Sequence, residues 1–430
     1  MIAGQLVEHA LKQAQGAQAT LRQSESTAVS FENDRLKSAQ SSQRTEIHVK
    51  VILDGKVGTS HTTDTQDLDG VVARALESAA FGSPAHFQFP GPRAVADVRV
   101  YDEAVPPVTK PEMVGIGREM LELIKEYNPD ILVGAGVHKQ VSRSEFANSS
   151  GVQFTDETTD FSVGASGQLV RGTDILEAGY GFGWRKRAID HVAIARQVIE
   201  RFRMAEKIAP IRSAAMPVIF APTGMGVLGL ALVLGFNGKN VFLGSSPLAG
   251  KLGERIADNK FSLTDNPLLD YAGSSSRYDS EGIPHQVTPL IEGGVLRNFL
   301  YDLDTAGRAG TQTTGHGVGC HPTNLIFAEG DVSYEDMVKG IQEGLLVFDV
   351  MGLGQGNPIS GEFSVNVQLG YKIEHGQVVG RVKDVMLAGN VYDALKDIVA
   401  IGDRAEWLST FGGSHFVPPI QIGSLSVVAR

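Results

Sequence analysis

Two histidines and a cysteine lie within six residues, in the segment Gly-His-Gly-Val-Gly-Cys-His at positions 315–321. Imidazole and thiolate groups are good zinc ligands, and a cysteine activated by a neighbouring base can act as a nucleophile. His316, Cys320 and His321 are therefore candidates for the atypical metal or thiol site of a self-sufficient hydrolase. The intervening glycines predict a loop, so a substrate-facing or simply surface role for this segment is the alternative interpretation.

A glycine-rich turn is the second candidate. Residues 224–229 read Gly-Met-Gly-Val-Leu-Gly and follow a predicted strand at 217–221, which matches the dinucleotide-binding fingerprint G-x-G-x-x-G. That fingerprint also needs an acidic residue about 20 positions further on to bind the ribose, and residues 242–247 contain none. Nucleotide binding through Gly224–Gly229 is kept as an alternative function, and close packing of the turn is the structural interpretation.

The helix expected after this turn, at 227–236, carries no ionisable side chain. A helix N-terminus next to flexible glycines is a typical place for a ligand. The chain also contains no His-Glu dipeptide, which excludes the zinc-peptidase motif H-E-x-x-H. This helix has the position of an active-site helix without its chemical groups.

Asp279 and Glu281 are two residues apart in a predicted strand, so we expect them on the same side of it, where they line a cleft or are merely solvated. The segment Trp-Arg-Lys-Arg at 184–187 is the one basic cluster. The chain has 38 Lys and Arg against 49 Asp and Glu, a net charge of −11. This balance argues against a nucleic-acid partner, which would require clustered cations.

A single cysteine excludes intrachain disulfides and fits a reducing compartment. The N-terminus lacks the basic region of a signal peptide, and the apolar run at 227–236 is too short to cross a bilayer. We therefore expect a soluble cytoplasmic protein with no membrane partner.

The elements that position these groups follow a repeated order. We predict a helix at 2–14, a helix at 67–80, a helix at 111–127 and a helix at 190–208. Between the first two helices lie strands at 19–31, 45–53 and 56–62, with an Asp54-Gly55 hairpin turn joining the second strand to the third. Strands within 131–184 lie between the last two helices. A proline-rich linker at 87–107 contains one short predicted strand at 98–101. Helix, meander and helix thus occur twice, which hints at a structural duplication although the letters do not repeat.

Small residues and two prolines at 209–217 predict a domain boundary. The chain beyond it is rich in strands and glycines, with a helix at 333–343 and a hairpin turn at 374–377. The fold class is α+β, with two helix–β-meander–helix units followed by a β-rich C-terminal domain. The expected domains are 1–88, 108–208 and 216–430.

Several ordered blocks after residue 216 resemble the TldD/PmbA family of zinc peptidases, a group also described as modulators of DNA gyrase. The blocks lie at 252–254, 265–267, 278–283, 300–306, 314–317, 357–364 and 370–376, with a further similar stretch at 30–37. The resemblance therefore covers nearly the whole chain.

The resemblance also implies which type of subunit this is. TldD-like members carry His-Glu-x-x-x-His on the helix after the glycine turn and a cysteine near the C-terminus, and these groups hold zinc. The three motif positions are occupied here by Leu230, Ala231 and Gly235, and the only cysteine is Cys320. His415 lies near the position of the missing cysteine ligand and is interpreted as structural. The chain thus resembles a PmbA/TldE-like subunit with no cofactor of its own.

By the same resemblance, a TldE-like chain pairs with a TldD-like, zinc-bearing subunit, and the heterodimer trims or degrades peptides. A homodimer is the alternative where no such partner exists. We expect this chain to shape the peptide channel, with residues 315–321 and 357–364 as its lining. The candidate substrate-binding residues are His316, His321, Asn357, Ser360, Asp279 and Glu281.

Overall fold

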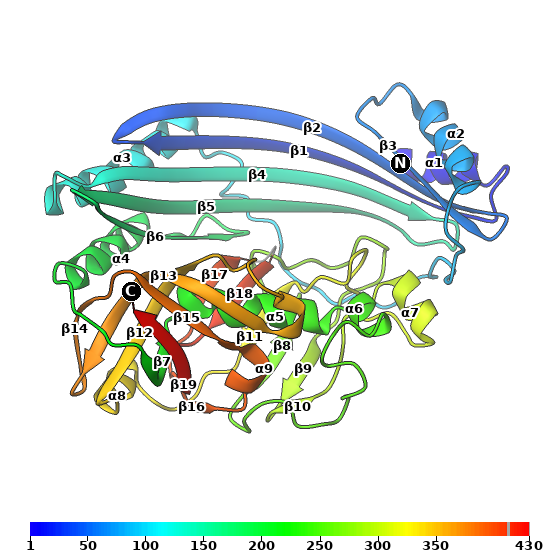
Figure 1. Cartoon of the computed structure of the whole chain (residues 1–430). Helices are drawn as coiled ribbons and strands as arrows, with labels where there is room; N and C mark the ends of the chain where they lie inside the picture. The colour runs from blue at the N-terminus through cyan, green and yellow to red at the C-terminus, as the bar shows by residue number, and fades with distance from the viewer. Residues whose placement is uncertain (411–412, 430) are drawn as a thin grey trace.

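The computed structural model describes residues 1–410 and 413–429, and its α+β architecture confirms the expected fold class. A long, curved six-stranded sheet lies over a β-rich body formed by the second half of the chain (Figure 1).

The first unit is a helix, a three-stranded meander and a second helix, as predicted. Its elements are α1 (Ile2–Ala10), β1 (Gly16–Glu32), β2 (Arg35–Leu53), β3 (Lys56–Thr62) and α2 (Leu68–Ala79). Asp54 and Gly55 both adopt positive φ and form the predicted tight turn between β2 and β3. The side chain of Asp67 accepts a hydrogen bond from the Gly70 N–H and so caps α2.

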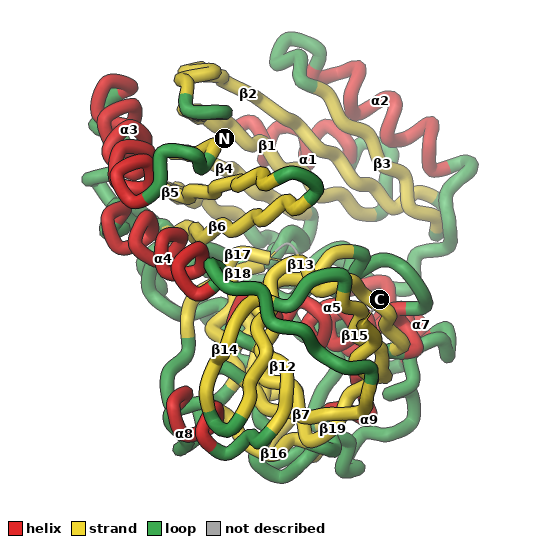
Figure 2. The backbone as a smooth tube through the Cα atoms, turned by 60° about the vertical axis from the view of Figure 1, so that its left-hand side comes forward, coloured by secondary structure: helices red, strands yellow, loops and turns green. Residues whose placement is uncertain are grey.

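The second unit repeats this order. Its elements are α3 (Lys110–Tyr127), β4 (Leu132–Asn148), β5 (Gln153–Arg171), β6 (Asp174–Trp184) and α4 (His191–Met204). The side chains of Thr109 and Asp190 cap the two helices. Helices α3 and α4 pack together at one end of the sheet, and α1 and α2 pack at the other (Figure 2).

Strands β1 and β4 join the two units edge to edge, which gives one sheet in the order β3-β2-β1-β4-β5-β6. Both strands have 17 residues and run antiparallel, and Glu25 lies opposite Val141 near the middle of each. Pairing about the strand centres relates the two units by an approximate two-fold axis. The predicted pair of helix–β-meander–helix units is therefore confirmed, and the pair forms a single sheet.

Some predicted elements differ from the structure. The strand predicted at 45–53 begins ten residues earlier, because the polar residues from Arg35 onward pair with β1 without burying a face. The strand predicted at 98–101 is wrong: that stretch belongs to no sheet, and Arg99 instead donates its N–H to the Asp270 carboxylate and accepts a bond from the Tyr271 N–H. The helix predicted at 190–208 ends at Met204. The helix predicted at 333–343 shortens to α8 (Tyr334–Lys339), because a strand begins at Glu343.

The C-terminal half contains two further sheets. One has the order β12-β7-β19-β15-β13-β14, and pairing of β12 with β13 closes it into a barrel. Its strands are β7 (Ala214–Phe220), β12 (Glu343–Met351), β13 (Glu362–Glu374), β14 (Gln377–Arg381), β15 (Val385–Asn390), β16 (Ile398–Ile401, paired with β19) and β19 (Ile420–Ala429). The predicted hairpin turn at 374–377 is confirmed, since it joins β13 to β14.

The other sheet has the order β10-β9-β8-β11-β18-β17. Its strands are β8 (Leu263–Asp265), β9 (Thr288–Glu292), β10 (Val295–Leu296), β11 (Asn324–Phe327), β17 (Glu406–Thr410) and β18 (Gly413–Val417). The remaining short elements are η1 (Pro222–Met225), α6 (Gly238–Phe242), α7 (Leu303–Ala309), η2 (Pro358–Ser360) and α9 (Val391–Ala394).

The apolar helix α5 (Gly226–Phe236) lies within the C-terminal core, packed against residues of both of these sheets. Its position explains why it is hydrophobic on all sides. At 11 residues it is far shorter than a bilayer requires, and in the part of the chain that the structure describes no helix has the length and apolar character of a membrane span.

Candidate functional site

The helix that would carry metal ligands in a TldD-like chain is α5. Ala231 and Gly235 are buried and Leu230 is half-buried. A Cβ atom at Gly235 would lie 2.5 Å from the Tyr392 hydroxyl oxygen, so the aromatic ring occupies the space of a larger side chain. That hydroxyl donates to the Ala231 carbonyl at 3.2 Å, and burial raises the pKa of Tyr392 to about 12, which keeps it a donor at neutral pH. Helix and tyrosine are thus locked together by packing and a hydrogen bond.

In the glycine-rich turn before α5, close packing explains one of the glycines. A Cβ atom at Gly224 would lie 2.4 Å from the Val347 carbonyl oxygen, so only glycine lets the turn approach β12 this closely. Gly226 and Gly229, one turn further along, line a cavity instead.

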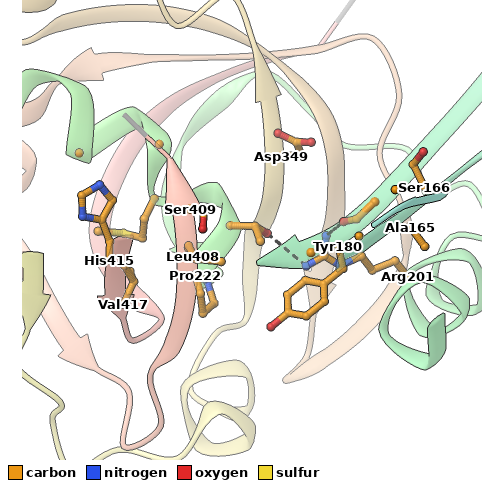
Figure 3. Close-up of a pocket in the computed structure, with 18 of the residues that line it drawn as sticks. Ala165, Ser166, Tyr180, Arg201, Pro222, Asp349, Leu408, Ser409, His415 and Val417 are labelled. Atoms are coloured by element: carbon orange, nitrogen blue, oxygen red, sulfur yellow. Dashed lines mark hydrogen bonds between the residues drawn. The ribbon is translucent and has the colours of Figure 1, made fainter. Parts of the chain in front are cut away.

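This cavity has a volume of about 660 Å³ and lies between the long sheet and the N-terminus of α5 (Figure 3). One wall consists of small residues from the second unit of the sheet, including Gly134, Gly136, Gly164, Ser166, Gly179 and Gly181. The opposite wall is mostly apolar and includes Pro222, Met225, Leu325, Phe327, Leu408 and Val417. A mainly apolar cavity of this size with few polar groups is typical of a ligand site.

The outer edge of β6 borders the cavity. β6 is the last strand of its sheet, so among the described residues its outer edge pairs with no further strand of that sheet, although Arg201 donates to the Gly179 carbonyl and Trp184 forms an isolated bridge with Ala272. A second cavity of about 400 Å³ continues past Gly183 and Trp184, and Ser409 lines both cavities. Together the two cavities follow β6 along residues 179–184.

Arg201 of α4 stands at the cavity wall. Its Nη1 donates to the Gly179 carbonyl, and its Nη2 lies 3.4 Å from the Thr223 hydroxyl. The rings of Tyr180 and Phe348 flank the guanidinium, with centroids 5.1 and 5.2 Å away. Burial lowers the pKa of Arg201 from its usual value.

His415, on β18, is buried at the other side of the cavity. Its Nδ1 accepts a hydrogen bond from the Leu325 N–H at 3.3 Å. This bond ties β18 to β11, which is a structural role of the kind that the sequence analysis assigned to His415.

The histidine–cysteine loop does not gather into one site. His316 is fully buried: its Nε2 lies 2.9 Å from Asp265 Oδ2, and its Nδ1 lies 2.9 Å from the Thr314 hydroxyl. Cys320 is buried as well, and desolvation raises its pKa to about 11, which makes it a poor nucleophile. His321 is exposed. Within the described residues, no three His, Cys, Asp or Glu side chains are grouped so that they could hold a metal ion.

Asp279 and Glu281 do not lie on a strand as predicted; they belong to a buried turn. Asp279 Oδ1 accepts the N–H groups of Glu281 and Ile283, and its Oδ2 accepts that of Gly317. Glu281 accepts hydrogen bonds from Lys50 Nζ at 3.3 Å and from the Leu303 N–H at 2.8 Å. Desolvation raises the pKa of both carboxyl groups. The expectation of two acids side by side on a strand failed because a turn with the sequence Asp-Ser-Glu-Gly satisfies its own backbone donors.

Asn357 and Ser360 belong to a different region, the short η2 turn that packs against α5. The Asn357 side chain caps this turn by accepting the Ser360 N–H, and the Ser360 carbonyl accepts a bond from the Asn390 side chain. Asn357 is exposed and Ser360 is half-buried.

The cavity residues Arg201, Thr223 and Asp349 were not found from the sequence, because they come from three distant elements without a common motif. One signal was available. Arg201 falls on the apolar stripe of α4, whose buried residues are Ile194, Ala195, Val198, Arg201 and Phe202. A charged residue on the buried face of an amphipathic helix requires a partner or a function.

Comparison with known proteins places the fold in a family. Residues 213–429 match the "PmbA/TldA metallopeptidase C-terminal domain", residues 17–79 match its domain 1, and residues 103–205 match its central domain. The structure is similar to that of TldE from Thermococcus kodakarensis, with a TM-score of 0.92, 21% identity and full coverage of both chains. It is also similar to a protein from Thermotoga maritima described as a candidate modulator of a DNA gyrase, with a TM-score of 0.90, 24% identity and 99% coverage of each chain.

The chain is also similar in sequence to several proteins. An uncharacterized protein of Methanocaldococcus jannaschii is 28% identical over 367 residues, which are 83% of this chain and 84% of that one. The metalloprotease PmbA homolog of Haemophilus influenzae is 24% identical over 425 residues, 94% of this chain and 89% of that one. Metalloprotease PmbA of Escherichia coli O157:H7 is 31% identical over 224 residues, 51% of each chain. The three domain matches together span most of the sequence, and the chain therefore belongs to the PmbA/TldD family of metallopeptidases.

Proposed function

We propose that this chain is a PmbA/TldE-like subunit that carries no catalytic zinc and acts with a TldD-like, zinc-bearing partner. The observation that carries the proposal is at α5. The motif positions hold Leu230, Ala231 and Gly235, and the Tyr392 ring fills the space where a histidine at 235 would project. The helix is thus built for packing rather than for metal binding.

In the proposed complex, the partner's zinc supplies the hydrolytic chemistry and this chain holds part of the peptide. The groove along β6 supports this role. Its glycine wall lets a peptide backbone approach closely, and the part of the β6 edge between Gly179 and Trp184 offers backbone hydrogen bonds that do not depend on side-chain identity. Such binding suits an enzyme that handles varied peptides.

The loop and turn residues have two proposed roles. His321, Asn357 and Ser360 are at least partly accessible and are proposed to contact the peptide. His316, Asp279 and Glu281 are buried, and we propose that they act by positioning the loop at 315–321.

The test begins with the full chain purified alone under reducing conditions. We expect near zero zinc or iron per chain by elemental mass spectrometry and no peptide hydrolysis. Co-expression with a TldD-like chain from the same genome should give a heterodimer on gel filtration, with about one zinc per pair and peptidase activity. A homodimer that hydrolyses peptides without the partner would contradict the proposal. So would about one tightly held metal per chain that is lost in His316→Ala or His321→Ala.

A further inference from the structure

Arg201 is a buried cation that forms no direct ion pair in the part of the chain that the structure describes. Its side chain lies on the apolar face of α4, and the residue is 5% exposed. Among the described residues Arg201 forms no ion pair within 4 Å, and the carboxylates of Glu406 and Asp349 interact with its charge without bonding to it. The nearby Glu406 instead accepts a hydrogen bond from the Tyr180 hydroxyl at 3.0 Å. Burying a charge is costly unless the charge is paired and hydrogen-bonded, so this arrangement needs a compensating group.

The guanidinium also has unused donors. An arginine has five N–H groups, and only the contacts with the Gly179 carbonyl and the Thr223 hydroxyl engage them here. Its Nε is buried without a hydrogen-bond partner among the described residues. The structure therefore leaves part of the hydrogen-bonding capacity of Arg201 unused, while its charge is offset only by carboxylates that do not bond to it directly.

The Arg201 guanidinium lies in the cavity wall, with its Nε buried there. Both groups that bond the guanidinium, Gly179 and Thr223, line the cavity, as does Arg201 itself. The flanking rings of Tyr180 and Phe348 fix the plane of the guanidinium, which reduces the entropy lost when a ligand binds. Figure 3 shows Arg201 and Tyr180 together on one side of the cavity, across from Leu408 and His415.

The cavity contains one acid of its own. Asp349 Oδ1 accepts the N–H of the next residue, Val350, at 2.8 Å, and desolvation raises the pKa of its carboxyl group. Asp349 would repel an anion placed beside it. The favourable place for an anionic group is therefore the Arg201 end of the cavity, with the apolar wall left for the rest of the ligand.

We propose that this cavity binds a carboxylate group of the peptide, which pairs with the guanidinium of Arg201. The inference rests on the proposed peptide-holding function and gives it a chemical preference. A planar guanidinium with free N–H groups matches a carboxylate in a bidentate arrangement. The carboxylate comes either from the C-terminus of the peptide or from an Asp or Glu side chain, and the test separates these two sources.

The test uses fluorescein-labelled alanine–valine pentapeptides and fluorescence anisotropy with the full chain. One peptide has a free C-terminal carboxylate, a second is amidated, and a third is amidated with a central glutamate. The free acid or the glutamate peptide should bind about tenfold to a hundredfold more tightly than the neutral amide, the range given by a hydrogen bond to a charged group. Whichever of the two binds tightly identifies the source of the carboxylate.

Variants then locate the site. Arg201→Gln should abolish the preference for a carboxylate, and Arg201→Lys should retain part of it. Arg203→Gln is the matched control, because Arg203 is an exposed arginine on the same helix that pairs with Glu200. Ser166→Leu, which fills the cavity from the sheet side, should block binding of the carboxylate peptides even if the Arg201 variants fail to fold.

The outcomes are distinguishable. Equal binding of the acidic and neutral peptides by the unaltered chain would overturn the inference and leave the peptide-holding function intact. A carboxylate preference that survives Ser166→Leu would also overturn it, since the anion would then bind elsewhere. Failure of all three peptides to bind, alone or with the zinc-bearing partner, would refute the proposed function itself.

Discussion

Replacing His316 by alanine should destabilise the protein strongly without changing its metal content. His316 Nε2 lies 2.9 Å from Asp265 Oδ2, and both side chains are completely buried. Asp265 also accepts the N–H and hydroxyl groups of Thr323, at 2.7 and 2.8 Å. Removing one member of a buried, hydrogen-bonded pair costs about 3–5 kcal/mol, because the other member loses its compensation. We expect a loss of this size from His316→Ala.

The loss is large enough to measure by thermal unfolding. In a cooperative unit of about 150–250 residues, each kcal/mol lowers Tm by roughly 2–4 °C, so the expected decrease is about 6–20 °C. His321→Ala is the matched control, because His321 belongs to the same loop but is exposed, and it should change stability by less than about 0.5 kcal/mol.

A metal-binding role for the two histidines predicts a different result from a buried His316–Asp265 pair. If His316 and His321 acted together as metal ligands, both variants would lose metal and activity to a similar extent. A Tm for His316→Ala within about 2 °C of the unaltered chain would refute the argument from the buried pair. A double-mutant cycle with Asp265→Asn measures the coupling directly, and an interaction near zero would have the same meaning.

Three further predictions concern other buried groups. Desolvation lowers the pKa of His285 to about 4, so between about pH 6.5 and pH 4 the unfolded chain binds a proton at this residue that the folded chain does not. The free energy of unfolding should therefore fall by about 3 kcal/mol as the pH drops through this window. In guanidinium denaturation at several pH values, His285→Gln should flatten this part of the profile of midpoint against pH. The same pH dependence of stability in His285→Gln and in the unaltered chain would contradict this prediction. The Cys320 thiol of the folded chain should not react with a disulfide reagent at pH 8, and one thiol per chain should react after denaturation. Rapid labelling of the folded protein would show instead that the thiol is accessible. Gly235→His should lower the free energy of unfolding by at least about 3 kcal/mol in chemical denaturation, because Tyr392 occupies the space of the new side chain. Adding Tyr392→Ala should recover part of this loss. A Gly235→His variant as stable as the unaltered chain would show that helix α5 can shift.

Local signals in the sequence predicted much of the fold. Helical periodicity gave α2 and α3 to within a residue or two, and the Asp54-Gly55 and His375-Gly376 turns gave two hairpins. The start of β2 was missed because residues 35–44 show no apolar alternation; only the neighbouring β1 makes them a strand. Pairing of this kind depends on a partner elsewhere in the chain.

The candidate site was harder to predict for the same reason. The loop at 315–321 was identified by its histidines and cysteine, yet the role of His316 depends on Asp265, which is 51 residues away. The main cavity is assembled from both halves of the chain, and much of its wall is defined by glycines, whose contribution is the absence of a side chain. The candidates His316, Cys320, Asp279 and Glu281 are therefore buried, whereas most of the wall around the open cavity consists of glycines and apolar residues.

The pairing of β1 with β4 about their centres has the geometry of an isologous dimer interface, in which two identical surfaces meet across a two-fold axis. In a symmetric dimer, any substitution appears on both sides of the axis. Here one chain supplies both sides, so each half can change independently. The glycines that the sheet contributes to the cavity wall, including Gly134, Gly164 and Gly181, all belong to its second unit. Covalent fusion of two similar units thus permits a one-sided groove that an exact dimer of one unit would have to duplicate.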